Sequence, residues 1–135
     1  MQLTGRCYCG DIRYQANGEI QIRAQCHCRE CQYLSGGGPN FTVGVPAEGF
    51  TYTQGMPSQF TRSDIDNAVT REFCPRCGTQ IATRVPMLPH LVLLKVGTLD
   101  DPAAFGIPEM AIFTVDRQAF HLMPENIVTF EGAPG

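Results

Sequence analysis

All seven cysteines of the chain fall into three tight groups, and this grouping limits what the chain can fold into. The groups are Cys7-Tyr-Cys9-Gly, Cys26-His-Cys28-Arg-Glu-Cys31 and Cys74-Pro-Arg-Cys77-Gly. A zinc ion binds thiolates at about 2.3 Å in a tetrahedral shell, so its ligands must converge within a few ångströms. Cysteines that are one or two residues apart meet this requirement. The sequence therefore predicts a zinc protein.

Disulfide bonds are the other structural use of cysteine, and the sequence argues against them. The number of cysteines is odd, and neighbours in a C-x-C pair do not reach good disulfide geometry in an extended chain. The first residues lack the apolar core of a signal peptide, and apolar runs such as 91–94 are too short to cross a membrane. We therefore expect a cytoplasmic protein in a reducing compartment, without a membrane partner.

The charge and length of the chain set further limits. The formal net charge is -3 and the sequence pI is about 5.5, whereas proteins that bind the phosphate backbone usually carry a basic excess. Nucleic acid is therefore not expected as a partner. A chain of 135 residues is long enough for one modest core, so we expect residues 1–135 to form a single domain.

Short stretches of β-branched and aromatic residues recur between Gly, Pro, Asn and Asp, which is typical of strands. The predicted strands are 12–16, 20–25, 41–45, 50–53, 58–61, 69–73, 80–85, 90–96 and 110–115. Several of these stretches alternate between polar and apolar residues, as in antiparallel sheets with one solvent-exposed face. Ten prolines and fourteen glycines argue against long helices, and one short helix is expected near 29–34. The predicted fold class is mainly β, a small zinc-binding fold of antiparallel sheets.

Seven thiolates divide most simply into four and three, because a four-thiolate site is closed and structural whereas a three-ligand site keeps an open position. Spacing alone allows two divisions. The outer pairs, Cys7, Cys9, Cys74 and Cys77, could close one site and leave Cys26, Cys28 and Cys31 as the open one. Alternatively, Cys74 and Cys77 could complete a site with two of the central cysteines. His27 is not assigned as a ligand, because in an extended C-H-C it points away from its neighbours.

The order of these motifs resembles the glutathione-dependent formaldehyde-activating enzyme family, which includes centromere protein V relatives. The matching motifs are Gly5-Arg-Cys7-Tyr-Cys9-Gly10, Cys26-His-Cys28-Arg-Glu-Cys31 followed by Ser35-Gly36, Phe73-Cys74-Pro-Arg-Cys77-Gly78-Thr79, and Val96-Gly-Thr-Leu-Asp-Asp-Pro102. The resemblance implies a mainly β fold and selects the first division. It implies a structural zinc on Cys7, Cys9, Cys74 and Cys77, and a labile, catalytic zinc on Cys26, Cys28 and Cys31.

The resemblance weakens from about residue 106 to the last residue, 135. Family members commonly carry a His three residues after the proline that is Pro108 here, and a Trp further on. This chain has Ala111 and Phe120 at or near those places, and it contains no Trp. We therefore expect the substrate pocket to differ in this segment.

An open three-thiolate zinc site can take a substrate thiol and lower its pKa. The resemblance implies that glutathione, or a similar thiol, adds to formaldehyde or a related aldehyde, which is carbon-sulfur lyase chemistry with Cys26, Cys28 and Cys31 as the catalytic residues. Arginine side chains and glycine amides can bind carboxylates. The candidates for binding glutathione are therefore Arg23, Arg29, Ser35, Gly36 and Gly37. The alternative function is a non-catalytic zinc module that binds a thiol, a metal or a protein partner.

Overall fold

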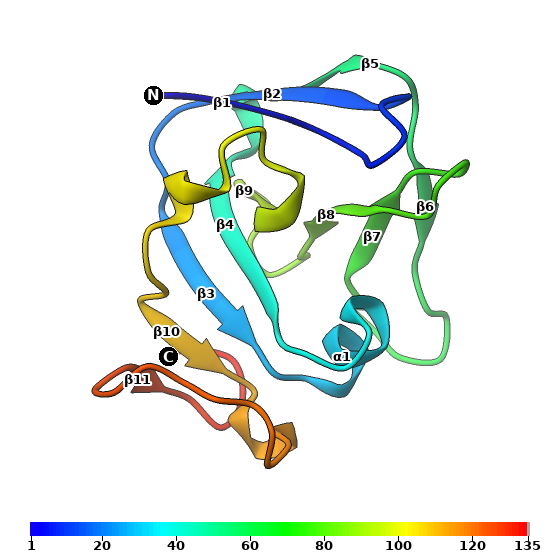
Figure 1. Ribbon diagram of the computed structural model, residues 1–135. Helices are drawn as coiled ribbons and strands as arrows, with labels where there is room; N and C mark the ends of the chain where they lie inside the picture. Colours follow the sequence, from blue (N-terminus) through cyan, green and yellow to red (C-terminus); the bar gives the residue numbers. More distant parts are fainter. Residues whose placement is uncertain (135) are drawn as a thin grey trace.

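The computed structural model describes residues 1–134 and is built on two β-sheets that face each other (Figure 1). The smaller sheet has the order β1-β2-β5, with β1 (Gln2–Arg6), β2 (Arg13–Asn17) and β5 (Phe50–Gln54). The larger sheet has the order β11-β10-β3-β4-β9-β8-β7-β6. Its strands are β3 (Ile22–Cys26), β4 (Asn40–Pro46), β6 (Ser58–Phe60), β7 (Thr70–Phe73), β8 (Gln80–Arg84), β9 (Leu91–Lys95), β10 (Met110–Ile112) and β11 (Val128–Thr129).

Helices are short throughout the described chain. The α-helix α1 (Arg29–Ser35) follows β3, as expected from the sequence. The 3-10 helices are η1 (Ala47–Gly49), η2 (Val96–Thr98), η3 (Pro102–Phe105) and η4 (Thr114–Asp116). Among residues 1–134, no helix has both the length and the apolar character that crossing a membrane requires.

The mainly β fold class is confirmed, and each predicted strand is present with its ends shifted by a few residues. Two strands were missed, β1 and the two-residue β11. The large sheet is also not purely antiparallel, because β10 runs parallel to β3 and to β11. The reason is the long connection 96–109, which carries the chain from β9 back to the start of β3 before β10 pairs there.

The hydrophobic core fills the space between the two sheets. On the large sheet, Val43 of β4 pairs with Leu94 of β9, and both side chains are fully buried toward the small sheet. The small sheet contributes Tyr14, whose hydroxyl bonds Thr98 at 2.8 Å. A Cβ atom on Gly5 would lie 2.3 Å from the Tyr14 ring, so the close approach of β1 and β2 requires glycine at that position. The two sheets are therefore held at a fixed distance near the end of β1.

The opposite face of the large sheet is polar and is partly covered by α1. Cross-strand partners in an antiparallel sheet point to the same face. Cys26 pairs with Asn40, and Thr42 pairs with Lys95, so these four side chains share one face of β3, β4 and β9. Glu30 of α1 forms an ion pair of 3.0 Å with Arg71 of β7 and fixes the helix over this face. A buried polar layer therefore adjoins the central cysteines.

Candidate metal centres and an adjoining cavity

The outer cysteines meet in one cluster, as the first division of ligands predicted. Cys7 and Cys9 lie in the turn between β1 and β2, and Cys74 and Cys77 lie in the turn between β7 and β8. Their sulfur atoms all lie within 4.8 Å of one another. The Sγ atoms of Cys7 and Cys9 are 3.6 Å apart, and those of Cys9 and Cys74 are 3.8 Å apart. The cluster therefore links the small sheet to the large one.

These sulfur distances fit zinc. A tetrahedral ion with bonds of about 2.3 Å places its sulfur ligands about 3.8 Å apart. Backbone amides also point at the sulfurs, because the Ile12 N–H donates to Cys7 Sγ at 3.3 Å and the Cys77 N–H donates to Cys74 Sγ at 3.4 Å. Such donors stabilise thiolate ligands. The donor set and its spacing are those of a closed structural site.

Thr79 connects the two turns of the outer cluster. Its Oγ1 accepts a hydrogen bond from the Tyr8 N–H at 3.0 Å, so its own proton is free to point at Cys77 Sγ, 3.1 Å away. This hydrogen bond lowers the pKa of the Cys77 thiol to about 5. A thiol of that pKa is a thiolate at neutral pH, which is the form that binds a metal ion.

The central cysteines form a second cluster of three, with all sulfur atoms within 4.8 Å of one another. Cys26 ends β3, Cys28 is the N-cap of α1, and Cys31 lies in the first turn of that helix. Cys28 Sγ accepts a hydrogen bond from the Cys31 N–H at 3.3 Å. Hydrogen bonds from the other two thiols lower the pKa of Cys31. Within the described chain no other Cys, His, Asp or Glu joins this group, so a fourth ligand position is open.

The two C-x-C pairs lie at or beyond the ends of strands rather than within them. β1 ends at Arg6 and β3 ends at Cys26, so Cys7, Cys9 and Cys28 lie in turn or capping positions. A strand would hold the two sulfurs of a C-x-C pair on one face, and the turn and capping positions additionally let the chain bend so that the sulfurs converge on one point. All seven cysteines are free thiols rather than disulfides.

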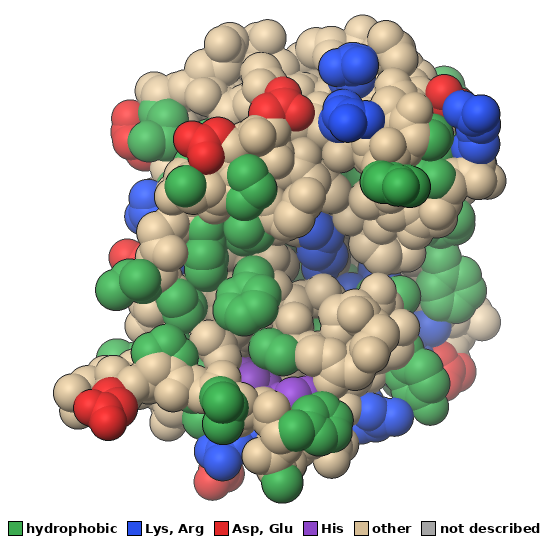
Figure 2. All heavy atoms as spheres, viewed as in Figure 1, with side chains coloured by type: hydrophobic (Ala, Val, Ile, Leu, Met, Phe, Trp, Pro, Cys, Tyr) green, Lys and Arg blue, Asp and Glu red, His purple; other side chains and the backbone are tan. Residues whose placement is uncertain are grey.

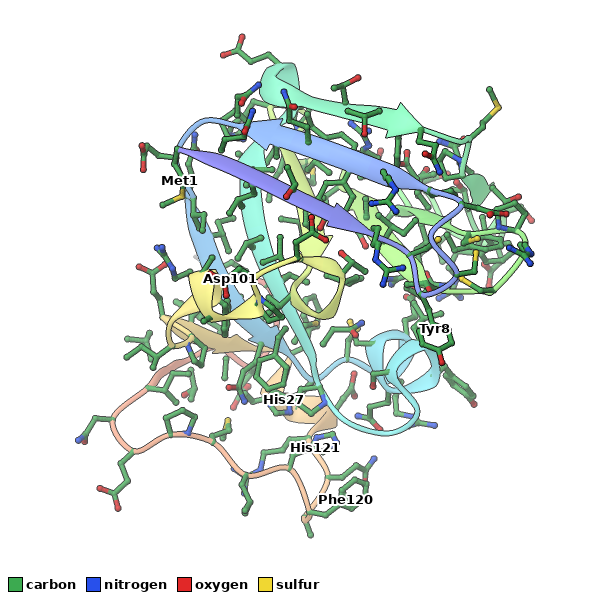
Figure 3. All side chains as sticks on the ribbon, turned by 45° about the horizontal axis from the view of Figure 1, so that its top comes forward. Met1, Tyr8, His27, Asp101, Phe120 and His121 are labelled. Atoms are coloured by element: carbon green, nitrogen blue, oxygen red, sulfur yellow. The ribbon has the colours of Figure 1, made fainter. Side chains whose placement is uncertain are left out.

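His27 is fully buried and hydrogen-bonded, as expected for a residue that is not a ligand. Its Nε2 lies 3.0 Å from the Gln25 side chain, and its Nδ1 lies 3.0 Å from Nδ1 of His121. Figure 3 shows the two rings close together. The other nitrogen of His121 lies 2.7 Å from the Gly37 carbonyl oxygen. Sequence reasoning missed His121, because a lone histidine outside any motif carries no signal of its own.

Of the five residues predicted to bind glutathione, four lie in α1 or directly after it and Arg23 lies near the start of β3, and each of them has an intramolecular contact. Arg23 donates to the Phe105 carbonyl at 3.0 Å, and Arg29 bonds Gln32 and lies over the Tyr33 ring. The three residues that end the helix also bond within the chain: Ser35 bonds the Gly38 carbonyl, and the N–H groups of Gly36 and Gly37 point to the Gln32 carbonyl. Their role in binding a substrate stays a prediction.

A cavity of about 750 Å³ opens at one end of three central strands of the large sheet, where β9 ends and β4 and β8 begin. Its walls are largely apolar, with polar groups at a few points. The lining residues include Leu34, Asn40, Phe41, Gln80, Lys95 and Phe105. Figure 2 shows a hollow near the middle of the face that it presents, with a basic side chain inside the hollow. Sequence reasoning missed this cavity, because its walls come from segments far apart in the chain.

Three comparisons place the chain among known proteins. Residues 2–116 match the model of the glutathione-dependent formaldehyde-activating enzyme family, so the match ends before His121. A crystal structure of a Rhodobacter sphaeroides protein has a similar fold, with a TM-score of 0.58 and 16% identity over 76% of this chain and 94% of that one. No curated protein sequence matches significantly. The family match spans most of the chain and includes all seven cysteines, and the chain therefore belongs to the glutathione-dependent formaldehyde-activating enzyme family.

Proposed function

We propose that this protein is a zinc-dependent enzyme of the carbon-sulfur lyase type, which joins glutathione or a similar thiol to formaldehyde or a related aldehyde. One observation carries the proposal: Asn40 and Lys95, which line a cavity of about 750 Å³, lie next to the three-cysteine cluster with its open ligand position. That volume lies within the range of small-molecule sites, roughly 300–1,000 Å³. Membership of the family supports the choice of thiol and aldehyde.

The residues that would hold the metals follow from the two clusters. Cys7, Cys9, Cys74 and Cys77 would hold a structural zinc, and Cys26, Cys28 and Cys31 would hold a second, more labile one. When bound, zinc at the three-cysteine cluster supplies Lewis acidity that favours the thiolate form of a thiol at neutral pH. A reducing compartment such as the cytoplasm would keep all seven cysteines available as metal ligands.

The proposed reaction needs no oxidant or reductant. The sulfur of the thiol forms a bond to the carbonyl carbon, and the electron pair of the C=O bond moves to the oxygen. That oxygen takes up the proton that the thiol lost, and the product is an S-hydroxymethyl thiol. The cavity would bring the two reactants together and exclude water, which also adds to formaldehyde. Binding of the thiol by Arg23, Arg29, Ser35, Gly36 and Gly37 belongs to the same proposal.

Exchange of formaldehyde with S-hydroxymethylglutathione tests this function. The uncatalysed reaction is measurable by magnetisation transfer with ¹³C-formaldehyde, so the readout is the increase in exchange rate caused by the protein. We expect the zinc-loaded wild type to accelerate exchange and Cys28→Ala to lose that acceleration. Cys28 is half-buried and outside the hydrophobic core, so the variant should fold. Met87→Ala, which truncates an exposed side chain in the turn between β8 and β9 and outside the cavity, is the control and should keep full activity.

Two results would contradict the proposal. Exchange at the uncatalysed rate with a fully zinc-loaded wild type would favour the non-catalytic zinc module. Equal acceleration by wild type and Cys28→Ala would show that the chemistry occurs away from the central cysteines. The zinc content of each sample, measured alongside the rate, separates a missing metal from a missing activity.

A further inference from the structure

Lys95, the only lysine in the chain, is buried without an acidic partner. It ends β9, lines the cavity and is only 9% exposed. Among residues 1–134, no Asp or Glu forms an ion pair with it. Burial lowers the pKa of Lys95, which reflects the cost of holding a charged amine away from water. Burying a charge away from any carboxylate is unfavourable, so this position needs an explanation beyond packing.

Two further polar atoms at the same cavity lack hydrogen-bond partners. They are Nδ2 of Asn40, a donor, and Oε1 of Gln80, an acceptor. Asn40 is 9% exposed and shares a sheet face with Lys95, because Thr42 lies two residues after Asn40 and pairs with Lys95. Unsatisfied buried polar groups are rare in native proteins, and each needs an explanation such as a functional role or a bound partner. Here two such atoms and an unpaired amine border one cavity.

The surroundings show where a ligand would find these groups. Much of the remaining wall is apolar, including Leu34, Phe41 and Phe105. Asn40 is also the cross-strand partner of Cys26, and its amide lies near enough to the Cys31 thiol to lower the pKa of that thiol without making a hydrogen bond of good geometry to it. Asn40 and Lys95 therefore lie on the side of the cavity that adjoins the central cysteines, whereas Gln80 lines it from the start of β8. A molecule held there would have its own reactive atom within reach of that cluster.

We propose that Lys95, Asn40 and Gln80 bind a carboxylate of the substrate and its neighbouring N–H group, so that the site selects peptide or amino-acid thiols over neutral ones. The Lys95 ammonium and the Asn40 amide donate to the carboxylate. Gln80 Oε1 accepts from the N–H that lies beside a carboxylate in any peptide. The inference rests on the proposed function, which supplies the identity of the thiol. It adds that Lys95 determines which thiols the site prefers.

A simpler role for Lys95 is to balance the negative charge of the central thiolates, since Cys31, Cys26 and Cys28 all act on it electrostatically. The two roles predict different results. A counter-charge would help to retain the metal and would affect every ligand alike. A carboxylate anchor would affect only ligands that carry the carboxylate, and it would leave the zinc content unchanged.

Binding of S-methylglutathione and of its diethyl ester, measured by calorimetry on the zinc-loaded protein, separates these roles. Both probes have a blocked sulfur, so binding does not depend on turnover. We expect the wild type to bind the acid at least about tenfold more tightly than the ester. Lys95→Met should remove that preference with ester affinity and zinc content unchanged, and Lys95→Arg should keep much of it. Arg13→Met removes an exposed positive charge outside the cavity and should keep the full preference.

Three outcomes would overturn the inference: equal binding of acid and ester by the wild type, no binding of either, or an equal fall for both in Lys95→Met together with loss of zinc. If Lys95→Met does not fold, Gln80→Glu takes its place. This variant adds a negative charge at nearly constant size and should weaken the acid at least about tenfold more than the ester. Formaldehyde exchange is measured separately, so catalysis without an acid preference would leave the proposed function standing and reject only the anchor.

Discussion

The two cysteine clusters use the same ligand but are built in opposite ways. The four-cysteine cluster joins two turns, and the contacting sulfurs of Cys9 and Cys74 are 65 residues apart in sequence. The three-cysteine cluster is made by a single segment, 26–31, at the end of β3 and the start of α1. The first cluster can form only when both sheets are in place. The second cluster needs only one strand end and one helical turn. The fold therefore positions this cluster, and the stability of the fold does not depend on it.

The surroundings of the two clusters also differ, in how tightly they are packed. Cys7 and Cys74 belong to the hydrophobic core, and Gly5 beside them has no space for a Cβ atom. The loop after the central cysteines is open, since a Cβ atom added to Gly36, Gly37 or Gly38 would meet nothing within 4 Å. Close packing therefore accompanies the four-cysteine cluster, whereas space and unpaired polar groups accompany the cluster proposed to react.

The largest effect is expected from Cys74→Ser. Structural zinc sites contribute metal-binding free energy to folding, on the order of 10 kcal/mol, which is comparable with the whole stability of a small domain. We expect the variant to be unfolded by circular dichroism at room temperature, whereas Cys28→Ser, the same change in the central cluster, should remain folded. A folded Cys74→Ser protein that retains tightly held zinc at the outer cluster would remove the distinction between the two sites.

Gly5→Ala tests the packing beside the outer cluster. The new Cβ atom would lie 2.3 Å from the Tyr14 ring and 2.4 Å from the Thr98 carbonyl oxygen, so β1 or η2 must move. We expect a loss of about 3 kcal/mol or more in the free energy of unfolding, measured by urea denaturation. Gly38→Ala is the control in the open loop and should change stability by less than about 0.5 kcal/mol. Similar losses in both variants would mean that the two regions are equally tightly packed.

His121→Ala should reduce stability by less than Gly5→Ala does, and its effect should be confined to the region of the central cluster. His121 holds the loop after that cluster through the Gly37 carbonyl at 2.7 Å and holds His27 at 3.0 Å. Losing both contacts should cost roughly 1–3 kcal/mol and speed hydrogen exchange of the amides in 36–38. Leu122→Ala, a change at the exposed residue on the other side of His121, is the control. If both variants exchange alike, His121 does not support the loop.

The same contrast explains what the sequence could predict. Ligand spacing and strand composition are local signals, so they indicated both cysteine clusters, α1 and nine strands. β1 was missed because Leu3 and Gly5 are its only inward-facing residues, and Gly5 is a poor strand former. Lys95, Asn40 and Gln80 were missed because only strand pairing brings them to one cavity. A single buried lysine looks in sequence like any surface lysine.

Cys31→Ala should change stability least while removing the function. Cys31 is buried, but it lies outside the hydrophobic core and its cluster is local, so replacing its thiol by a methyl group should cost only about 1–2 kcal/mol. We expect bound zinc to fall from about two ions per chain to about one, with formaldehyde exchange lost and the thermal transition nearly unchanged. The reason is that the outer cluster alone joins the two sheets. Collapse of the fold in Cys31→Ala would show that the central cysteines are structural as well, and the division between a closed and an open site would have to be abandoned.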